Sequence, residues 1–495
     1  MGSKLNAFIA ALIAAVIHYV YRRWTRDIAR RESGCQPVTQ VWSKEPFFGF
    51  DFQMSIHLDL PSLYRRHERL GKSFHVTPLN NISTICTIAP ENIRIVNCEK
   101  GWGVQPMRLS GMEHFCGRGF LTTDGDIWQH SRKLLKPTFS KHNLIDLSVL
   151  SAEVDRLFLE IPEGAQTIDL QPHFYNMFLN TSLHFLLGVH PSDKHAGVPY
   201  ESEVFIDAFH DAAFRTMLRI MLGRFWALAP KSRYLESCEI AHKFIDHYVD
   251  QALEEGPRLS TENSEKAAKQ SMAQGLAAQT DDRESIRSQI LQGMLASLET
   301  TSALLGNSIF LLARHPQYWQ HIRAESKQRG SDLLNFDSLL NFKTVQNVLY
   351  ESRLLALRLY PVFPLLARVA LSDATLPVGG GINQTDRVYV PKGSSVVMSY
   401  FALHRDPLVF GNDVEDFRPE RWESIRPEQW QFMPFGGGNR ACLGQQKALV
   451  EAAYVLVRMA STFGTLQSRD NAPWKGELKL TCKSANGCKV ALVKG

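Results

Sequence analysis

One stretch near the end of the chain decides the fold: Phe435-Gly436-Gly437-Gly438-Asn439-Arg440-Ala441-Cys442-Leu443-Gly444. Its glycines predict a loop, and the apolar pattern of residues 443 to 463 predicts a long helix after it. Cys442 therefore lies just before a helix, where unpaired N–H groups and the helix dipole are expected to lower the pKa of its thiol. Thiolate binds metals, and glycines let backbone approach a flat ligand closely. Arg440 is placed to reach an anionic group on that ligand.

The whole string matches F-x-x-G-x-R-x-C-x-G and resembles the haem-ligand loop of the cytochrome P450 superfamily. An isolated cysteine is usually a small buried hydrophobic residue, so the complete motif carries the interpretation. The resemblance implies a haem b cofactor whose iron takes Cys442 as its axial thiolate, which favours O–O cleavage. It also implies that Arg440 pairs with a haem propionate and that Phe435 packs near the sulfur. Gly436 belongs to the same cofactor-binding loop.

Two further segments resemble the haem surroundings of this family. Trp128 and Arg132 fit W-x-x-x-R, a spacing that places both side chains on one face of a helix. The resemblance implies that both address a haem propionate, whereas the pair alone would be a common coincidence. Arg368, at the end of Pro364-Leu365-Leu366-Ala367-Arg368, resembles another propionate contact.

The apolar pattern predicts a long helix from about Asp282 to Arg314. Midway along it, Ala296-Ser297-Leu298-Glu299-Thr300-Thr301 resembles the oxygen-activation motif A-G-x-D-T-T. A threonine inside a helix usually bonds a carbonyl one turn back. The resemblance implies instead that Thr300 is catalytic and contacts dioxygen, and that Glu299 relays protons. Ser297 replaces the usual glycine and Glu299 the usual aspartate, and we expect activity to survive both changes.

A structural ion network is expected behind the haem, but one part of its motif is altered. Phe417-Arg418-Pro419-Glu420-Arg421-Trp422 matches F-x-P-E-R-F/W, which implies that Arg421 joins the network. Its partners normally come from E-x-x-R on a helix, expected here over about 341 to 359. Glu351 and Arg358 are instead seven residues apart, or about 10 Å along a helix axis. Residues 353 to 356 are either an insertion absorbed as a bulge or a gene-model error at an exon junction.

The N-terminus predicts a membrane anchor. Leu5 to Tyr21 reads LNAFIAALIAAVIHYVY, 17 residues or about 25 Å of helix, and basic residues follow from Arg22 onward. Positive charge after the apolar stretch favours a signal-anchor that leaves the bulk of the chain in the cytosol. The alternative is a buried or amphipathic helix. We expect residues 1–24 to be a single-pass anchor in the endoplasmic reticulum membrane, 25–50 a linker and 51–495 the catalytic domain.

Composition supports an ordinary globular protein. The chain has 495 residues and a formal net charge of +5, which argues against a nucleic-acid partner. Hydrophobic residues make up 44% and charged residues 21%, which argues against wholesale disorder. The eight cysteines form no C-x-x-C pair and indicate no disulfide framework. Helical patterns dominate, with short strands expected over 364 to 400 and a polar surface linker over Gly256 to Glu284. The expected fold is mainly α with a small β portion, the cytochrome P450 fold.

The last quarter of the chain resembles the fungal alkane and fatty-acid hydroxylases, for example in Thr375 to Gly381 and Ala402-Leu403-His404-Arg405. The resemblance implies a monooxygenase that uses O2 and NADPH-derived electrons supplied by NADPH-cytochrome P450 reductase. Its hydrophobic substrate would be a long-chain fatty acid or an alkane. The altered motifs leave two alternatives: oxidation of a polyketide or terpenoid secondary metabolite, or a degenerate, non-catalytic haem protein. The basic residues expected to face the reductase are Arg132, Lys133, Lys136 and Lys447.

Overall fold

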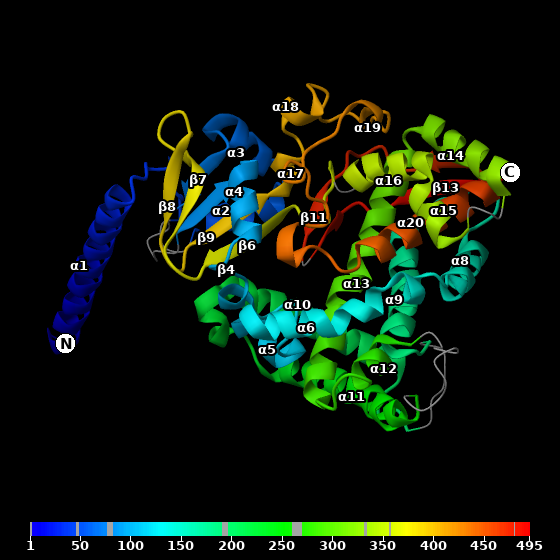
Figure 1. The fold of residues 1–495 in the computed structure, drawn as a ribbon, viewed down its shortest axis with the longest axis horizontal. Coiled ribbons are helices and arrows are strands. Elements are labelled where there is room, and N and C mark those ends of the chain that lie inside the picture. Colours follow the sequence, from blue (N-terminus) through cyan, green and yellow to red (C-terminus); the bar gives the residue numbers. More distant parts are fainter. Residues whose placement is uncertain are drawn as a thin grey trace.

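The computed structural model describes residues 2–45, 49–76, 83–190, 197–259, 270–330, 334–355, 358–479 and 481–495. Figure 1 shows a β-rich part on the side of the N-terminal helix and a larger helical part beyond it. Helices dominate and strands form the smaller portion, which confirms the predicted mainly α fold.

The longer helices belong mostly to the helical part, and short helices connect them. The long ones are α5 (Gln105–Cys116), α6 (Gly125–Leu135), α8 (Ser148–Glu160), α9 (Leu170–Leu187), α10 (Ser202–Leu222), α11 (Ser232–Leu259), α13 (Arg283–Leu312), α14 (Pro316–Arg329), α16 (Lys343–Leu355) and α20 (Gln445–Thr462). The short ones are α2 (Phe50–Leu58), α3 (Ser62–Leu70), α4 (Pro90–Cys98), α7 (Lys141–Leu144), α12 (Met272–Ala277), α15 (Phe336–Asn341), α17 (Tyr400–Leu403), α18 (Pro407–Phe410) and α19 (Arg421–Ser424). Turns of 3-10 helix are η1 (Lys136–Phe139), η2 (Gly223–Leu228) and η5 (Gly438–Arg440).

The main sheet has six strands in the order β1-β2-β3-β9-β6-β4. They are β1 (Gln40–Val41), β2 (Ser73–Val76), β3 (Thr84–Thr87), β4 (Trp102–Gly103), β6 (Leu365–Ala370) and β9 (Ser395–Ser399). β9 pairs parallel to β3 and antiparallel to β6, where Arg368 lies opposite Val396. This pairing ties chain segments that are hundreds of residues apart and fixes the position of Arg368.

The described residues form three further, smaller sheets. They pair β7 (Ala374–Gly380) with β8 (Asp386–Val390), β11 (Gly476–Leu478) with β12 (Cys482–Ser484), and β13 (Lys489–Lys494) with both β10 (Phe463–Ser468) and β5 (Ile168–Asp169). The strands β6 to β9 all fall within residues 364 to 400, where the sequence predicts short strands. The β11–β12 hairpin reaches back toward α13, which matters for the site described below.

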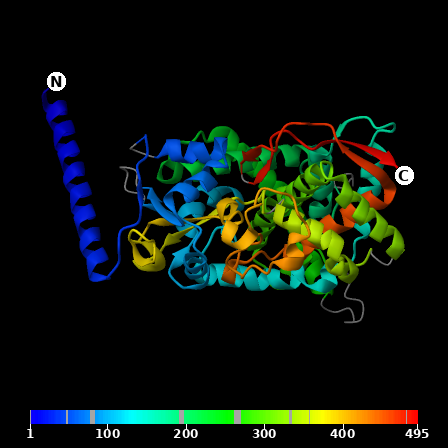
Figure 2. The same ribbon diagram turned by 90° about the horizontal axis from the view of Figure 1, so that it is seen from above.

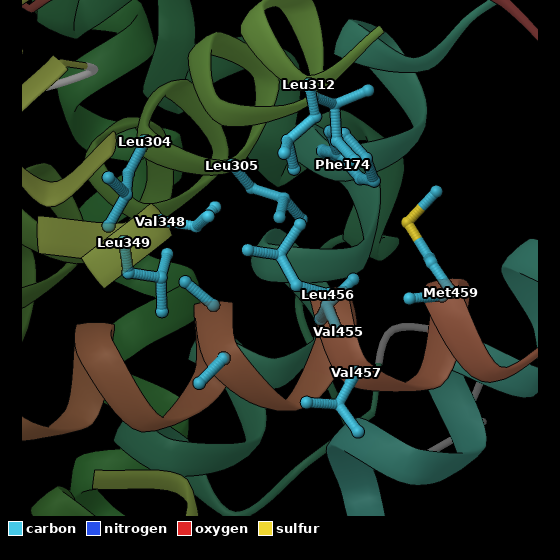
Figure 3. Close-up of a cluster of buried hydrophobic side chains, with 14 of the residues drawn as sticks. Phe174, Leu304, Leu305, Leu312, Val348, Leu349, Val455, Leu456, Val457 and Met459 are labelled. Atoms are coloured by element: carbon cyan, nitrogen blue, oxygen red, sulfur yellow. The ribbon is translucent and has the colours of Figure 1, made fainter. Parts of the chain in front are cut away.

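The long helix α13 is the centre of the fold. The Asp282 side chain caps the start of α13, because it accepts a hydrogen bond from the Ser285 N–H at 3.0 Å. The sequence predicts the start of the helix at this residue. By length and composition α13 could cross a membrane. However, 78% of its most apolar 18-residue stretch is buried inside the protein, as in the core helix of a globular domain. Figure 3 shows its side chains meeting those of α9, α16 and α20 in the largest buried apolar cluster, with Leu305, Phe174 and Leu456 close together. Burying that surface from water is what holds these helices together.

The N-terminal helix α1 (Gly2–Glu32) stands away from the body in both Figure 1 and Figure 2. It continues past the predicted anchor boundary at residue 24. Several apolar side chains close together on α1 are exposed, among them Ile13 at 53% and Ile17 at 63%. Such a concentration of exposed apolar side chains is unusual on the surface of a soluble domain. Beyond α1, the Gln36 N–H donates to the Arg387 carbonyl and β1 adds to the sheet, so the segment predicted as a linker carries secondary structure.

The predicted linker from Gly256 to Glu284 needs correction. α11 continues through its first residues to Leu259, and α12 lies in its second half with Met272 and Leu276 buried. A capping box between Ser271 and Gln274 starts α12. The apolar residues are too few to stand out from the polar stretch, yet they are enough to fix one turn of helix against the core. Residues 260–269 lie outside the described residues.

Candidate active site

The loop that carries Cys442 is shaped by two glycines. Gly436 has φ +68° and Gly438 has φ +63°, conformations that residues with a Cβ rarely adopt. At Gly438 a Cβ would also collide with the Asn97 carbonyl oxygen at the end of α4. The Cys442 N–H donates to the Phe435 carbonyl at 2.9 Å and closes the loop. Helix α20 begins shortly after, so the sulfur lies just before a helix, as the sequence predicts.

The pKa of Cys442 differs from the sequence prediction. Burial among protein atoms raises the pKa of the thiol, and this effect outweighs the lowering by the Gly444 N–H and by the charge of Arg132. The sequence argument considered only the helix terminus and missed this desolvation. The residue nevertheless retains accessible surface. A sulfur surrounded by protein but open on one side suits a ligand whose bound metal keeps it deprotonated.

Four arginines from separate elements converge beside this loop. We call them the loop cluster: Arg108 on α5, Arg132 on α6, Arg368 on β6 and Arg440 in the loop itself. Arg440 Nη2 lies 2.7 Å from Asp124 Oδ1, and its guanidinium lies 4.5 Å from the centre of the Trp128 ring. Arg132 donates to the Ala441 carbonyl at 2.7 Å. Trp128 and Arg132 therefore both reach the Cys442 loop from one face of α6.

Arg368 and Arg108 complete the loop cluster. Arg368 is buried and donates to the Ala367 carbonyl at 3.0 Å and to Asn97 Oδ1 at 3.4 Å. Arg108 donates to the Leu121 carbonyl at 3.1 Å. Sequence reasoning missed Arg108, because no motif surrounds it and only the fold of α5 brings it beside the others.

The charges of the loop cluster are poorly balanced. Burial, helped by the neighbouring guanidinium groups, lowers the pKa of Arg108 and of Arg440 to about 10. Asp124 opposes this shift for both. Four cations around one paired carboxylate, in the described residues, form a site for a ligand with more than one anionic group. Together with the accessible sulfur of Cys442, this donor set fits haem and its two propionates.

The residues on α13 that resemble the oxygen-activation motif have different hydrogen-bond partners from one another. Thr300 Oγ1 donates to the Ala296 carbonyl at 2.8 Å, the local bond expected of a threonine inside a helix. The Ser297 hydroxyl is buried and has no hydrogen-bond partner in the described residues. Glu299 Oε2 accepts a hydrogen bond from Thr481 Oγ1 at 2.7 Å. Thr481 lies between β11 and β12, and no motif indicated this long-range contact.

A second group of arginines comes from other elements and is buried. We call Arg358, Arg405 and Arg421 the network cluster. Arg358 donates to the carbonyls of Val414, Asp416 and His404, the last two at 3.2 and 3.4 Å. Arg421 bonds Asp413 through Oδ1 at 2.6 Å and through its carbonyl at 2.9 Å. The predicted network arginines thus both bind the chain that follows α17.

Two predicted residues around this network need separate mention. Glu351 lies in α16, but its side chain and those of residues 353 to 355 are outside the described part of the chain, as are residues 356 and 357. Phe435 packs against the apolar core cluster around α20. The Arg405 guanidinium donates to the carbonyls of Arg358 and Leu359 at 3.1 and 2.8 Å, which braces the chain just after α16.

Comparisons with known proteins agree with this site. The cytochrome P450 family model matches residues 42–486. Cytochrome P450 monooxygenase himC of Aspergillus japonicus is 36% identical over 99% of this chain and 90% of its own length. Cytochrome P450 monooxygenase fsdH of Fusarium heterosporum is 35% identical over 100% and 90%, and cytochrome P450 52E2 of Candida apicola is 30% identical over 94% and 92%. The chain therefore belongs to the cytochrome P450 family and is an oxidoreductase, a haem-dependent monooxygenase.

Proposed function

We propose that this enzyme hydroxylates a hydrophobic substrate with O2 and electrons that NADPH-cytochrome P450 reductase delivers from NADPH. The cofactor would be haem b, held through the sulfur of Cys442, and when bound it would supply the oxygen-activating chemistry. The observation that carries this proposal is the Cys442 sulfur beside the loop cluster. Reconstitution with reductase, NADPH and 18O2 tests it: one labelled oxygen should enter the product, and product that takes its oxygen from water would contradict it.

Residues of this chain have separate roles in that reaction. The arginines of the loop cluster would bind the two propionates of the cofactor. Thr300 holds a hydroxyl on α13 and Glu299 an exchangeable proton beside it, so the pair supplies protons. Arg358 and Arg421, with Glu351, keep the cofactor-binding segment folded. Haem content and coupling of NADPH use to product should separate these roles: substitutions in the loop cluster lower the first, and Glu299→Gln lowers only the second.

The favoured substrate is a long-chain fatty acid or an alkane. This choice rests on the resemblance of the last quarter of the chain to that branch of the family. The alternative, oxidation of a polyketide or terpenoid, is favoured by Ser297, which stands where the family usually has glycine. Its buried hydroxyl has no hydrogen-bond partner in the part of the chain that the structure describes. A spectral titration of the ferric enzyme distinguishes them: a shift with acyl chains and none with cyclic polyketides or terpenoids supports the first, and the reverse supports the second.

The enzyme is anchored by α1 in the endoplasmic reticulum membrane, with the catalytic domain in the cytosol. Support comes from the exposed apolar side chains Ile9, Ile13, Val16, Ile17 and Val20 on a helix that stands apart from the body. Removing residues 2–24 should move the protein from an alkali-resistant membrane fraction to the soluble one. Unchanged membrane retention of the shortened chain would overturn the anchor.

The reductase contacts a basic surface near α6. Lys133 and Lys136 are exposed there, whereas Lys447 is bonded to Glu451 at 2.6 Å and Arg132 to the Ala441 carbonyl. Of the four predicted contact residues, the two exposed lysines are therefore the ones that we propose contact the reductase. Lys133→Glu with Lys136→Glu should raise the reductase concentration needed for half-maximal turnover and weaken its dependence on salt. An unchanged salt dependence would place the reductase elsewhere.

A further inference from the structure

The Asp124 side chain, just before α6, bonds two separate segments of the chain. Its Oδ1 accepts a hydrogen bond from the Val104 N–H at 2.9 Å and another from Arg440 Nη2 at 2.7 Å. Its Oδ2 accepts from the Gln105 N–H at 2.8 Å, and the side chain is only 13% exposed. Hydrogen bonds to both oxygens fix the place and the direction of this carboxylate.

Asp124 supplies the cap at the start of α5. Val104 precedes this helix and has no side-chain oxygen to cap it, although the first N–H groups of a helix need an acceptor from outside. The Asp124 carboxylate accepts from this end of the helix although it lies 20 residues further along the chain. The Gln105 side chain returns the contact, because its Oε1 accepts from the Asp124 N–H at 3.1 Å. Asp124 and the start of α5 are therefore joined in both directions, as in a capping box.

A glycine makes room for this carboxylate. β4 ends at Gly103, which pairs with Val369 of β6, the residue after Arg368. A Cβ at Gly103 would collide with Asp124 Oδ2. Gly103 does not have a positive φ, so glycine is needed here for room and not for its backbone conformation.

Asp124 holds one end of the Arg440 guanidinium and leaves the rest for a ligand. Arg440 Nη2 donates to Asp124 Oδ1 and, at 2.6 Å, to the Thr123 carbonyl. Nη1 has a longer bond of 3.4 Å to the Phe120 carbonyl, and Nε–H has no hydrogen-bond partner within the described residues. A guanidinium that is oriented before its ligand arrives binds that ligand at a lower entropic cost.

The same carboxylate acts on a second arginine of the loop cluster. Arg108 lies in the first turns of α5, where its backbone N–H donates to the Val104 carbonyl at 3.0 Å. The helix end that Asp124 caps therefore carries Arg108. Burial lowers the pKa of Arg108, Arg368 and Arg440, and the charge of Asp124 opposes this lowering in all of them.

We propose that Asp124 is the positioning residue of the cofactor site, which holds Arg440 and the start of α5, with Arg108, in the places from which these arginines bind the propionates. This inference rests on the proposed haem site. A carboxylate that only balanced the charge of the cluster would compete with the propionates, so its removal would tighten the hold on haem. Removal of a positioning residue has the opposite effect, because the arginines must then be ordered again on binding.

Two variants separate the charge of Asp124 from its position. Asp124→Asn removes the charge and keeps the volume, whereas Gly103→Ala keeps every charge and displaces the carboxylate with its methyl group. Haem transfer from the purified holoenzyme to apomyoglobin should be about tenfold faster in both, the scale of one charge-assisted hydrogen bond. Slower or unchanged transfer in Asp124→Asn would show a mere counter-charge and overturn the inference.

The matched control is Asp126→Asn, which removes an exposed carboxylate from the first turn of α6 and should leave the transfer rate unchanged. A double-mutant cycle tests whether Gly103 acts through Asp124. Asp124→Ala shortens the side chain, so the addition of Gly103→Ala should speed the transfer no further. A further increase would mean that Gly103→Ala acts through β4 instead, and would contradict the inference.

The ferric–ferrous reduction potential of the haem-loaded protein is a readout that a merely structural role would not move. It should fall in Gly103→Ala, because displaced cations stabilise the more negative, reduced cofactor less. Faster haem loss with an unchanged potential would mean that the fold is only loosened, and would overturn the positioning role. A wild type that holds no haem would defeat the proposed function itself. A haem-loaded wild type that matches both variants in transfer rate and potential would overturn this inference alone.

Discussion

The loop cluster and the network cluster are both groups of arginines, but their burial and their bonding differ. Arg358, Arg405 and Arg421 of the network cluster are buried, whereas of the loop cluster only Arg368 is buried and the others are half-buried. In the network cluster, Arg358 is fully buried and donates to three backbone carbonyls, and Arg421 reaches both the side chain and the backbone of Asp413. In the loop cluster, Arg108 and Arg132 each donate to one carbonyl, whereas Arg440 donates to two carbonyls and to Asp124. The charges of Arg440 and Arg368 help to lower the pKa of Arg108.

This difference separates a structural role from a binding role. A guanidinium whose N–H groups are taken by carbonyls has little left for a ligand and contributes to folding. Cations that crowd each other around Asp124 gain when an anion arrives. Burial alone would group Arg368 with the network cluster, so the bonding partners and the neighbouring charges of each guanidinium are needed to assign its role.

The largest expected effect is on the network cluster. Arg358→Ala would leave the carbonyls of His404, Val414 and Asp416 buried without this donor, at about 1 to 3 kcal/mol each. We expect the free energy of unfolding to fall by about 4 kcal/mol or more, measured by urea titration. Arg65→Ala, which removes an exposed pair with Asp59, is the matched control and should change little. An Arg358→Ala protein with unchanged free energy of unfolding would contradict the structural role of the network cluster.

A buried histidine offers a contrasting case, a potential cation that stays neutral. Burial lowers the pKa of His67 to about 4, below its ordinary 6.5. The folded state thus binds fewer protons than the unfolded state, and stability present above pH 6.5 is lost as the pH falls toward 4. The loss should reach about 3 kcal/mol at 1.36 kcal/mol per pKa unit. Unfolding measured across this range should show a flatter pH profile in His67→Gln, and equal slopes would contradict the assignment.

A smaller effect is expected in the loop cluster, and with a different signature. Arg108→Gln removes one crowded charge, so the protein without haem should unfold at the same or higher urea concentration. Haem binding should weaken by about 10- to 100-fold, the equivalent of one charge-assisted hydrogen bond of about 1.5 to 3 kcal/mol. Haem transfer to apomyoglobin measures the second quantity. Destabilisation of the haem-free protein with normal haem retention would place Arg108 with the structural arginines.

The smallest effect is expected at the edge of the network cluster. Arg405 bonds Glu415 at 2.7 Å, but the Glu415 side chain is 61% exposed. Because carbonyls already hold Arg405 on its buried side, Glu415→Gln should cost less than about 1 kcal/mol in urea titrations. A cost near that of Arg358→Ala would mean that the carboxylate, and not the backbone, satisfies this cluster.

The sequence predicted those features whose chemistry is local. The glycine-rich loop before α20, the long helix α13 with its Asp282 cap, and the strands between 364 and 400 each depend on residues close together in the chain. Trp128 and Arg132 could be paired because four-residue spacing on a helix is itself a local rule. Three separate motifs also identified three of the four arginines of the loop cluster, Arg132, Arg368 and Arg440.

What escaped prediction depends on contacts between distant segments. Arg108 joins the loop cluster only because α5 folds beside the Cys442 loop, and Thr481 reaches Glu299 although 182 residues separate them in the chain. The pKa of Cys442 is raised because desolvation by the surrounding fold outweighs the local helix terminus that the sequence shows. The sequence did not predict helix α12, because the surrounding stretch is polar and the few apolar residues of the helix contact their partners only in the folded core.

The central claim is that Cys442 binds haem iron through its sulfur. The most direct measurement is the absorption spectrum of the purified, dithionite-reduced, CO-treated protein, recorded for the wild type and for Cys442→Ala. We predict that the wild type shows the band that gives the family its name and that Cys442→Ala lacks it. A wild type without this band, or a Cys442→Ala protein that keeps it, would contradict the account.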